Sequence, residues 1–410
     1  MDSGYRVPLF INRFSLSSRT SVGVQTRLLL APHSDWVHFH WWSSSFKQLD
    51  PRSILLENRL LSRYSFLHNV RFMRLCESLG MSAWIKDRLR PDWAARVENF
   101  RERVSCVYLA PLDEADAVRC LHLINLIGTP FVLHLWDVLE GDVRYGALGE
   151  LVRRAQVVFC ISQPLLNAVR SVRSGGELLS FTRDQSLYQA EPPTGSHLRV
   201  VMHGNVESYV EGLNDLDVAI DLLKAHGITI EVAFVGSPQI LRRCKTSLKR
   251  RVKVCGFQKT MHALDWELSN SHVAFLPGPK LDPQRNQRSR YSIPSRIIDY
   301  MALNLPIVGT VHPNSATGDL IRTLGLDATG LCSGPAQIAD CLLQLTQPDF
   351  WIKQSAHSRD AFEYWQAKEP PTQLLKRKIN QIAFTYPNSS DEGYTQHSCR
   401  EPQSSLSKVK

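Results

Sequence analysis

The sequence lacks any segment that would hold it in a bilayer. No uninterrupted apolar run approaches the ~18 residues of a membrane-spanning helix, although hydrophobic residues make up 43% of the 410 residues. The opening stretch MDSGYRVPLFINRF has no long apolar core of the kind found in secretory signals. We therefore expect a water-soluble, cytoplasmic protein.

The sequence also lacks cysteine and histidine patterns typical of metal or redox sites. Its nine cysteines include no CxxC pair, and most lie in apolar runs such as VVFCIS and VKVCGF. This placement predicts buried, reduced thiols. His38 and His40 form an HxH pair on a predicted strand, but no third ligand cluster accompanies them. We therefore predict packing roles for both histidines and no metal site.

Acidic residues are outnumbered, with 39 Asp and Glu against 48 Lys and Arg, a net charge of +9. A basic balance favours anionic partners such as nucleotides, phospholipid headgroups or nucleic acid. Nucleic acid fits less well, because the basic residues do not interleave with an aromatic platform. Residues 52–104 are basic, with leucines at helical spacing. They are interpreted either as an amphipathic helix on an anionic membrane or as a helix covering a sheet.

Apolar β-type runs alternate with helical patterns along the chain, which predicts an α/β fold with parallel sheets. The segment 188–196, YQAEPPTGS, is rich in Pro and Gly and has no apolar period. We predict two Rossmann-like, doubly wound domains facing across a cleft, residues 1–187 and 197–385, each with five or six strands. This domain prediction is compatible with last helices that pack back on the first domain. The polar, Ser-rich residues 386–410 are expected to be disordered.

The segment 271–311 combines a buried strand, a basic loop, a helix and a second buried strand. The helix is predicted to start near Pro294, with Ser292 as its N-cap. Helical spacing then places Ser292, Arg296 and Asp299 on one face. Free N–H groups in the first turn and a guanidinium suit a phosphate, and Asp299 is placed to accept hydrogen bonds from a ribose diol. The loop adds the cations Lys280, Arg285, Arg288 and Arg290.

One string in this segment resembles a known motif. It reads Pro294-Ser295-Arg296-Ile297-Ile298-Asp299-Tyr300-Met301-Ala302, followed by Pro306-Ile307-Val308. It resembles the donor-binding string P-S-K-x-x-E-Y-x-A-x-x-x-P-I/V of GT-B glycosyltransferases of the family 4 type (glycosyl transferases group 1). The resemblance implies that Asp299 binds the nucleotide ribose, with Ser295 and Arg296 beside the diphosphate.

The full predicted donor set also draws on the turn after strand 198–204, whose Gly and Asn match the GN variant of the family's phosphate-facing turn. The set is Gly204, Asn205, Pro277, Lys280, Arg290, Ser292, Ser295, Arg296 and Asp299. The chain departs from many relatives at three positions. Tyr291 stands where they have Glu, and Asn205 and Glu211 stand where they have Arg and Lys.

The first domain is expected to hold the acceptor. His134 and Asp137 lie at the end of a predicted strand, where the family commonly places His, or His and Asp, and where residues point into the cleft. With Arg296 they are the predicted catalytic residues. The alternatives are a core histidine and an aspartate that caps the next helix. Gly23 ends a Ser-rich loop, and with Gln25 and Arg27 in the following helix it forms the predicted acceptor-binding set.

The resemblance implies a hexosyltransferase that moves a sugar from a UDP- or GDP-sugar to a hydroxyl of a lipid-linked or saccharide acceptor. It implies retention of configuration, no metal and no cofactor besides the donor. The expected setting is polysaccharide, lipopolysaccharide or glycolipid assembly, with peripheral association at the inner face of the membrane. Two alternatives remain: a sugar-nucleotide epimerase of the same fold, and a catalytically degenerate subunit that supports a partner transferase.

Overall fold

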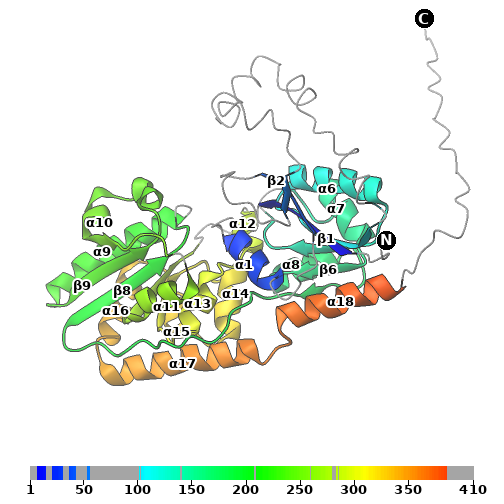
Figure 1. Ribbon diagram of the computed structural model, residues 1–410. Coiled ribbons are helices and arrows are strands. Elements are labelled where there is room, and N and C mark those ends of the chain that lie inside the picture. The colour runs from blue at the N-terminus through cyan, green and yellow to red at the C-terminus, as the bar shows by residue number, and fades with distance from the viewer. Residues whose placement is uncertain are drawn as a thin grey trace, which may run out of the picture.

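The computed structural model describes residues 7–14, 21–30, 37–42, 53–55, 101, 103–138, 141–206, 209–258, 260–278, 283–284 and 286–385. Most of the basic stretch 52–104, the tail 386–410, Lys280 and Arg285 lie outside these residues, so the predictions made for them have no counterpart below. Two parallel sheets, each with its own helices, form the molecule (Figure 1).

The N-terminal sheet has seven strands in the order β3-β2-β1-β4-β5-β6-β7, and every pairing is parallel. The strands are β1 (Val7–Phe14), β2 (Val37–Trp42), β3 (Ser53–Leu55), β4 (Val104–Ala110), β5 (Phe131–Leu135), β6 (Val157–Cys160) and β7 (Glu177–Leu178). The sequence predicted five or six strands. The difference arises at the edges, where β3 and β7 have only three and two residues.

The C-terminal sheet has five parallel strands in the order β10-β9-β8-β11-β12. They are β8 (His197–His203), β9 (Thr229–Val235), β10 (Val252–Val254), β11 (Val273–Pro277) and β12 (Ile307–Thr310). The chain leaves β8 toward β10 and returns on the other side with β11. The carboxyl ends of β8 and β11 therefore mark the point where the strand order reverses, the usual ligand position in open α/β sheets.

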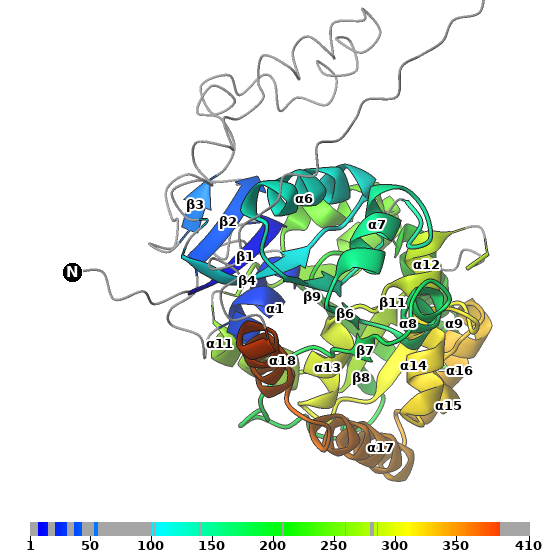
Figure 2. The same ribbon diagram turned by 90° about the vertical axis from the view of Figure 1, so that its right-hand side faces the viewer.

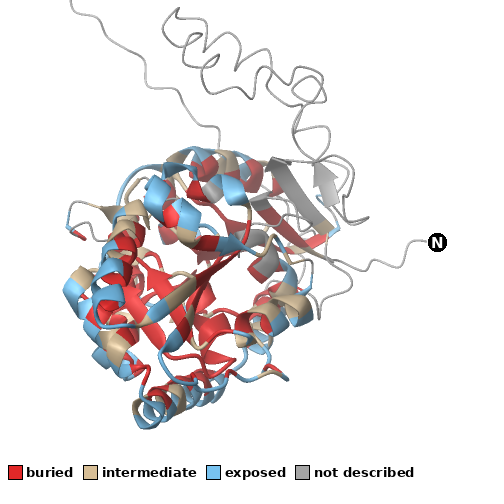
Figure 3. Cartoon of the chain, turned by 90° about the vertical axis from the view of Figure 1, so that its left-hand side faces the viewer, coloured by how far each residue is buried: buried red, intermediate tan, exposed pale blue. Residues whose placement is uncertain are grey.

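Helices connect the strands and cover both sheets, and Figure 3 shows the strands mostly buried between them. The N-terminal helices are α1 (Ser21–Leu30), α6 (Glu114–Ile127), α7 (Gly146–Arg154) and α8 (Gln163–Arg170). The C-terminal ones are α9 (Val210–Ala225), the 3-10 helix η3 (Pro238–Arg243), α10 (Thr246–Arg251), α11 (Met261–Ser269), α12 (Gln287–Tyr291), α13 (Arg296–Met301), α14 (Ala316–Thr323), α15 (Asp327–Gly330) and α16 (Pro335–Gln344). Side-chain caps fix several helix starts. Asp113 accepts from the amide of Asp116, and Ser162 accepts from that of Leu165.

The two last helices link the domains. Helix α17 (Pro348–Gln366) packs against α13, and α18 (Pro371–Thr385) crosses back to contact β4 and α1 (Figures 1 and 2). An aromatic stack follows the same crossing. Trp136 stacks on Phe181 with ring centroids 5.9 Å apart, and Phe181 stacks on Trp365 of α17 at 6.4 Å. Large aromatic surfaces buried in this way fix how the domains meet.

Seven cysteines fall in the described part of the chain, all of them free and five of them buried. Burial raises the pKa of Cys106 and Cys160 to about 12, which keeps both thiols protonated. In the same part of the chain, no helix combines the length and apolarity that a bilayer crossing requires.

Candidate functional site

The helix predicted to start near Pro294 is the short helix α13, and a second short helix, α12, lies in the stretch predicted as a basic loop. Helix α12 ends at Tyr291 and α13 begins at Arg296, because a residue before proline disfavours the helical region. Ser292 follows α12 and its amide donates to Arg288 O (2.9 Å), so its predicted N-cap role is wrong. The first-turn amides of Ile297 and Ile298 already donate to Pro294 O and Ser295 O. Those amides are therefore not free for a phosphate.

Arg296 joins the carboxyl ends of β8 and β11. Its Nη1 donates to the carbonyl oxygens of His203 (3.2 Å) and Asn205 (3.0 Å), and Nη2 donates to that of Pro277 (3.4 Å). Between the first two carbonyls, Gly204 has a φ of 77°, a left-handed turn that favours glycine. Pro277 and Asn205 therefore contact Arg296 through their backbone carbonyl oxygens.

Among the residues that the structure describes, the buried Arg296 guanidinium has no anionic partner. Arg296 is only 6% exposed, and its Nε has no hydrogen-bond partner. Within the described residues no carboxylate forms an ion pair with it, and its remaining neighbour is the Tyr209 ring at 5.1 Å. A buried charge is costly unless it is paired. The arrangement therefore favours an anion at this position.

Asp299 is buried and already paired. Its Oδ1 lies 3.1 Å from Arg183 Nε, and its Oδ2 lies 3.3 Å from His203 Nε2. The backbone of His203 is fixed by the same helix, because its amide donates to Tyr300 Oη (3.2 Å) and its carbonyl accepts from Arg296. The Asp299 carboxylate is therefore held in one orientation by these neighbours. Its side chain keeps 10% exposure.

Arg183 was missed at the sequence level. It lies between β7 and β8 in the connector 179–196, which has no apolar periodicity, so a single arginine there gives no signal. Its side chain is 5% exposed and also pairs with Asp265 of α11.

The remaining donor candidates shape the loop before α12 or face the other domain. Arg290 donates from Nε to Pro283 O and from Nη2 to Gln284 O, both at 2.9 Å, and so braces the basic loop. Ser295 is the N-cap of α13 without a side-chain cap hydrogen bond. Ser292 is buried and faces Asp137.

Asp137 lies at the interdomain boundary, just beyond β5. Burial raises the pKa of its carboxyl group, while the nearby Ser292 side chain and the charge of Arg288 oppose that rise. Close by, Ser162 Oγ donates to Tyr291 O (2.8 Å), and Gln287 donates to a carbonyl of the N-terminal domain. The carboxyl ends of β5 and β6 therefore meet α12. Asp137 caps no helix, because α7 has Tyr145 as its N-cap.

His134 is not at this boundary, so the prediction that it points into the cleft is wrong. It is 0% exposed, its Nδ1 shares a hydrogen bond with Tyr108 Oη, and its ring packs 4.2 Å from that of Trp136. Burial lowers its pKa to about 3, so it is neutral. All five residues of β5 are buried, as in a strand covered on both faces. His134 is therefore a core residue, the alternative left open by the sequence.

The predicted acceptor residues lie in or near helix α1. This helix begins at Ser21, so Gly23 lies in its first turn and not at the end of a loop. Gln25 is 5% exposed, and its Oε1 accepts from Thr182 N (3.0 Å), which ties α1 to the connector between the domains. Arg27 is exposed.

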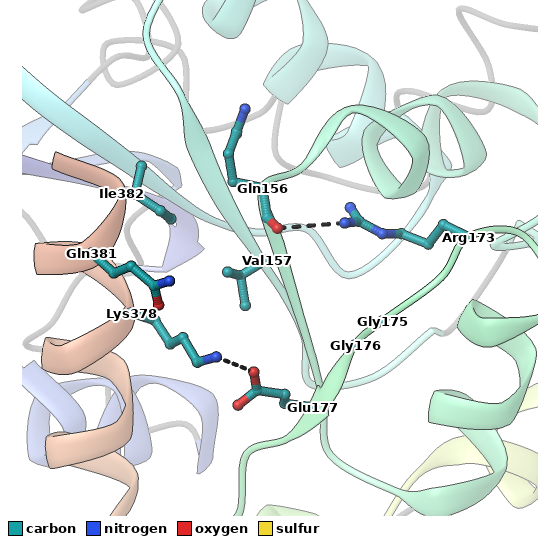
Figure 4. A pocket seen from close by; sticks show the side chains of 9 residues that line it. All are labelled: Gln156, Val157, Arg173, Gly175, Gly176, Glu177, Lys378, Gln381 and Ile382. Atoms are coloured by element: carbon teal, nitrogen blue, oxygen red, sulfur yellow. Dashed lines mark hydrogen bonds and ion pairs between the residues drawn. The ribbon is translucent and has the colours of Figure 1, made fainter. Parts of the chain in front are cut away.

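A separate pocket of about 330 Å³ lies between α18 and the strands β6 and β7 (Figure 4). Lys378 pairs there with Glu177, and Arg173 donates to Gln156 O (3.4 Å). Gln156 precedes β6 and Glu177 opens β7, so this pocket is at the amino ends of the strands. It is on the opposite edge of the sheet from Asp137 and takes no part in the site. Across the described residues, no group of three or more His, Cys, Asp or Glu side chains gathers as metal ligands would.

No protein-family model matches the sequence, and no curated protein matches it significantly. Solved structures do match. HepE of Anabaena in complex with UDP-glucose is 14% identical with a TM-score of 0.62, over 93% of this chain and 100% of that one. Sucrose-phosphate synthase of Thermosynechococcus elongatus is 12% identical with a TM-score of 0.61, over 93% and 100%. The lipopolysaccharide outer core galactosyltransferase WaaB is 11% identical with a TM-score of 0.52, over 92% and 99%.

At these identities the likeness concerns the fold. The two parallel sheets, the reversal of strand order beside Arg296 and the final helix that crosses back all fit that likeness. The chain has the GT-B fold, with two Rossmann-like α/β domains, as its glycosyltransferase neighbours do.

Proposed function

We propose that this chain is a glycosyltransferase that takes a sugar from a nucleotide-diphosphate donor and passes it to a hydroxyl acceptor. The observation that carries the proposal is the buried Arg296 guanidinium at the carboxyl ends of β8 and β11, which pairs with no carboxylate of the described part of the chain. A donor diphosphate would supply the missing negative charge. The complex of HepE with UDP-glucose supports a nucleotide sugar on this fold.

In the proposed reaction, negative charge grows on the leaving diphosphate as its bond to the anomeric carbon breaks. A cation that is fixed in advance stabilises such charge without reorganising. Arg296 is fixed by three backbone carbonyls and keeps its Nε–H unused. Asp299 would accept hydrogen bonds from the ribose. Asp137, across the boundary and with a raised pKa, would orient the acceptor hydroxyl or take its proton.

The finer parts of the proposal rest on the sequence motif around Arg296. They are retention of anomeric configuration, a UDP- or GDP-sugar as donor, and chemistry without a metal or further cofactor. The proposed acceptor is a saccharide or a lipid-linked saccharide, in polysaccharide, lipopolysaccharide or glycolipid assembly.

The proposal includes peripheral contact with an anionic membrane, supported by a basic surface on the C-terminal domain. Residues 242–253 contain no acidic residue. Their exposed cations are Arg242, Arg243, Lys245, Lys249, Arg250 and Lys253. Such clusters are attracted to anionic lipid surfaces. Vesicles of phosphatidylcholine with phosphatidylglycerol should sediment the protein at low salt, and pure phosphatidylcholine vesicles should not. Equal sedimentation with both would remove this part of the proposal.

Calorimetry and thermal shift with UDP, GDP, UDP-glucose and GDP-mannose test the donor site, because a ligand of the folded state raises its stability. Mass spectrometry of the incubated donor then separates the alternatives. A transferase releases the nucleoside diphosphate when a hydroxyl acceptor is added, whereas an epimerase returns an isomerised sugar nucleotide. A chain that binds none of these probes would fit a non-catalytic subunit and would overturn the proposal.

A further inference from the structure

The connector 179–196 inserts one arginine between two helices of the C-terminal domain. The Arg183 Nε lies 3.1 Å from Asp299 Oδ1 of α13, and its Nη2 donates to Asp265 Oδ1 of α11. The side chain is 5% exposed, so Arg183 forms a buried bridge: a charge-assisted hydrogen bond to Asp265 and an ion pair with Asp299. It is made by a segment that belongs to neither sheet.

The connector is fastened on both sides of Arg183. On the N-terminal side, the amide of Thr182 donates to Gln25 of α1 (3.0 Å), and the carbonyl of Phe181 accepts from Trp365 Nε1 (3.3 Å). On the other side, Ser186 Oγ donates to Asp265 Oδ2 (2.9 Å). The backbone that carries Arg183 therefore has little freedom, and the position of its guanidinium is set in advance.

We propose that Arg183 is a positioning residue that orients the Asp299 carboxylate toward the ribose diol of the donor nucleotide. This inference rests on the proposed function. An ionised carboxylate has about four acceptor sites. Arg183 lies against Oδ1 and His203 against Oδ2 at ion-pair distances without a hydrogen bond, so both oxygens keep lone pairs for the ribose hydroxyls. Asp299 has a short side chain, so its reach depends on this orientation.

The prediction compares UDP with 2′-deoxy-UDP, which lacks one of the two hydroxyls. We expect the wild-type chain to prefer UDP by ~10-fold or more, since hydrogen bonds to charged groups contribute about that much. Arg183→Gln should lower this preference to ~2-fold or less, mainly by weakening the binding of UDP. Arg183→Lys should give an intermediate preference, because it keeps the charge but not the planar fork. Calorimetry measures both dissociation constants for each variant.

Two control variants separate positioning from general stabilisation. Asp265→Asn keeps an oxygen for Arg183 Nη2 but loses a charge, so it should lower the melting temperature and keep the preference for UDP. Arg251→Met removes another paired arginine, which contacts Asp217 and Asp221 between α9 and α10. It should also keep the preference.

An Arg183→Gln variant that is folded and retains the wild-type preference, while Asp299→Asn loses it, would overturn the inference and leave the donor site intact. If Arg183→Gln does not fold, Arg183→Gln/Asp265→Asn takes its place, because it leaves no lone carboxylate at residue 265. Failure of the wild-type chain to bind UDP, GDP, UDP-glucose and GDP-mannose would instead reject the proposed function itself, and a chain that binds only guanine nucleotides is compared with GDP and 2′-deoxy-GDP in the same way. Loss of preference in Arg183→Gln and Asp299→Asn, but in neither control, supports the inference.

Discussion

The two parallel sheets can be compared at the carboxyl ends of their strands, at β5 in the N-terminal domain and at β8 and β11 in the C-terminal domain. Polar side chains have different environments at these two places. In the C-terminal domain Arg296 is buried on backbone carbonyls, and Asp299 is buried against Arg183 and His203. In the N-terminal domain His134 is buried as a neutral ring, and burial raises the pKa of Asp137.

This difference separates a half-site with fixed charges from one built around a neutral histidine. Retaining charges in a low-dielectric region requires fixed partners, and at Asp299 the C-terminal domain provides them. The N-terminal domain instead surrounds His134 with aromatic rings, which favour its uncharged form, and places Asp137 at the boundary beside Ser292 and Arg288. A charged diphosphate fits the first environment, and an uncharged hydroxyl acceptor fits the second.

The comparison is tested most strongly by Arg296→Met. Removing a fixed cation that faces a developing anion costs roughly 10²–10³-fold in turnover, so we expect a loss of at least ~100-fold. UDP affinity should fall as well, because the buried charge that the diphosphate would compensate is gone. Turnover with a responsive donor and calorimetry with UDP measure the two effects, and circular dichroism checks the fold.

Arg290→Met is the matched control for this change. Arg290 also donates to two carbonyls, but they belong to the loop at Pro283 and Gln284 and not to the strand ends. We expect a loss of ~10-fold or less. Comparable losses in both variants would show that the loop, and not the charge beside β8 and β11, limits the reaction.

The sequence predicted the two domains' strand pattern because strands covered on both faces are apolar almost throughout. An apolar run can be recognised from residues that are neighbours along the chain. The C-terminal strands β8, β9, β11 and β12 each coincide with an apolar run.

What the sequence could not predict depends on contacts between distant segments. Arg183 reaches Asp299 across 116 positions, and the connector that carries it has no period. His134 and Asp137 stand three residues apart, yet one packs in the core and the other faces α12, because the strand ends between them. The motif around Arg296 singled out α13 but did not indicate which of its groups are already bonded.

The second prediction is a smaller effect at Asp137. Because burial raises its pKa, the carboxyl group is protonated over a wider range of acidic pH than an ordinary aspartate. If its ionised form orients the acceptor, turnover falls as pH drops through that raised pKa. Asp137→Asn should lower turnover ~10-fold, which is less than the roughly 10²-fold or more that a general acid or base contributes. The variant should also lose this fall in turnover at acidic pH. UDP affinity should change less than ~2-fold, since the donor contacts lie in the other domain.

Asp142→Asn provides the comparison for Asp137. Asp142 lies in the same stretch of chain but pairs with Arg144 at the surface, and that hydrogen bonding lowers its pKa. Its replacement should leave both turnover and the acid-side fall near wild-type values. An Asp137→Asn variant with an unchanged pH profile would place the titrating group elsewhere.

The smallest effect on turnover is expected at His134, where stability changes and activity does not. Burial lowers its pKa to about 3 in the folded chain, against ~6.5 for an unfolded histidine. Between these values the unfolded chain binds a proton that the folded chain does not, so stability falls as pH drops, by ~1.4 kcal/mol per unit and ~2 kcal/mol by pH 5. His134→Gln should remove that share of the acid sensitivity in urea unfolding at pH 7 and pH 5, and should change turnover less than ~3-fold. The exposed His122→Gln should keep the full acid sensitivity. A tenfold loss of turnover in His134→Gln would return this residue to the reaction and erase the contrast between a neutral and a charged half-site.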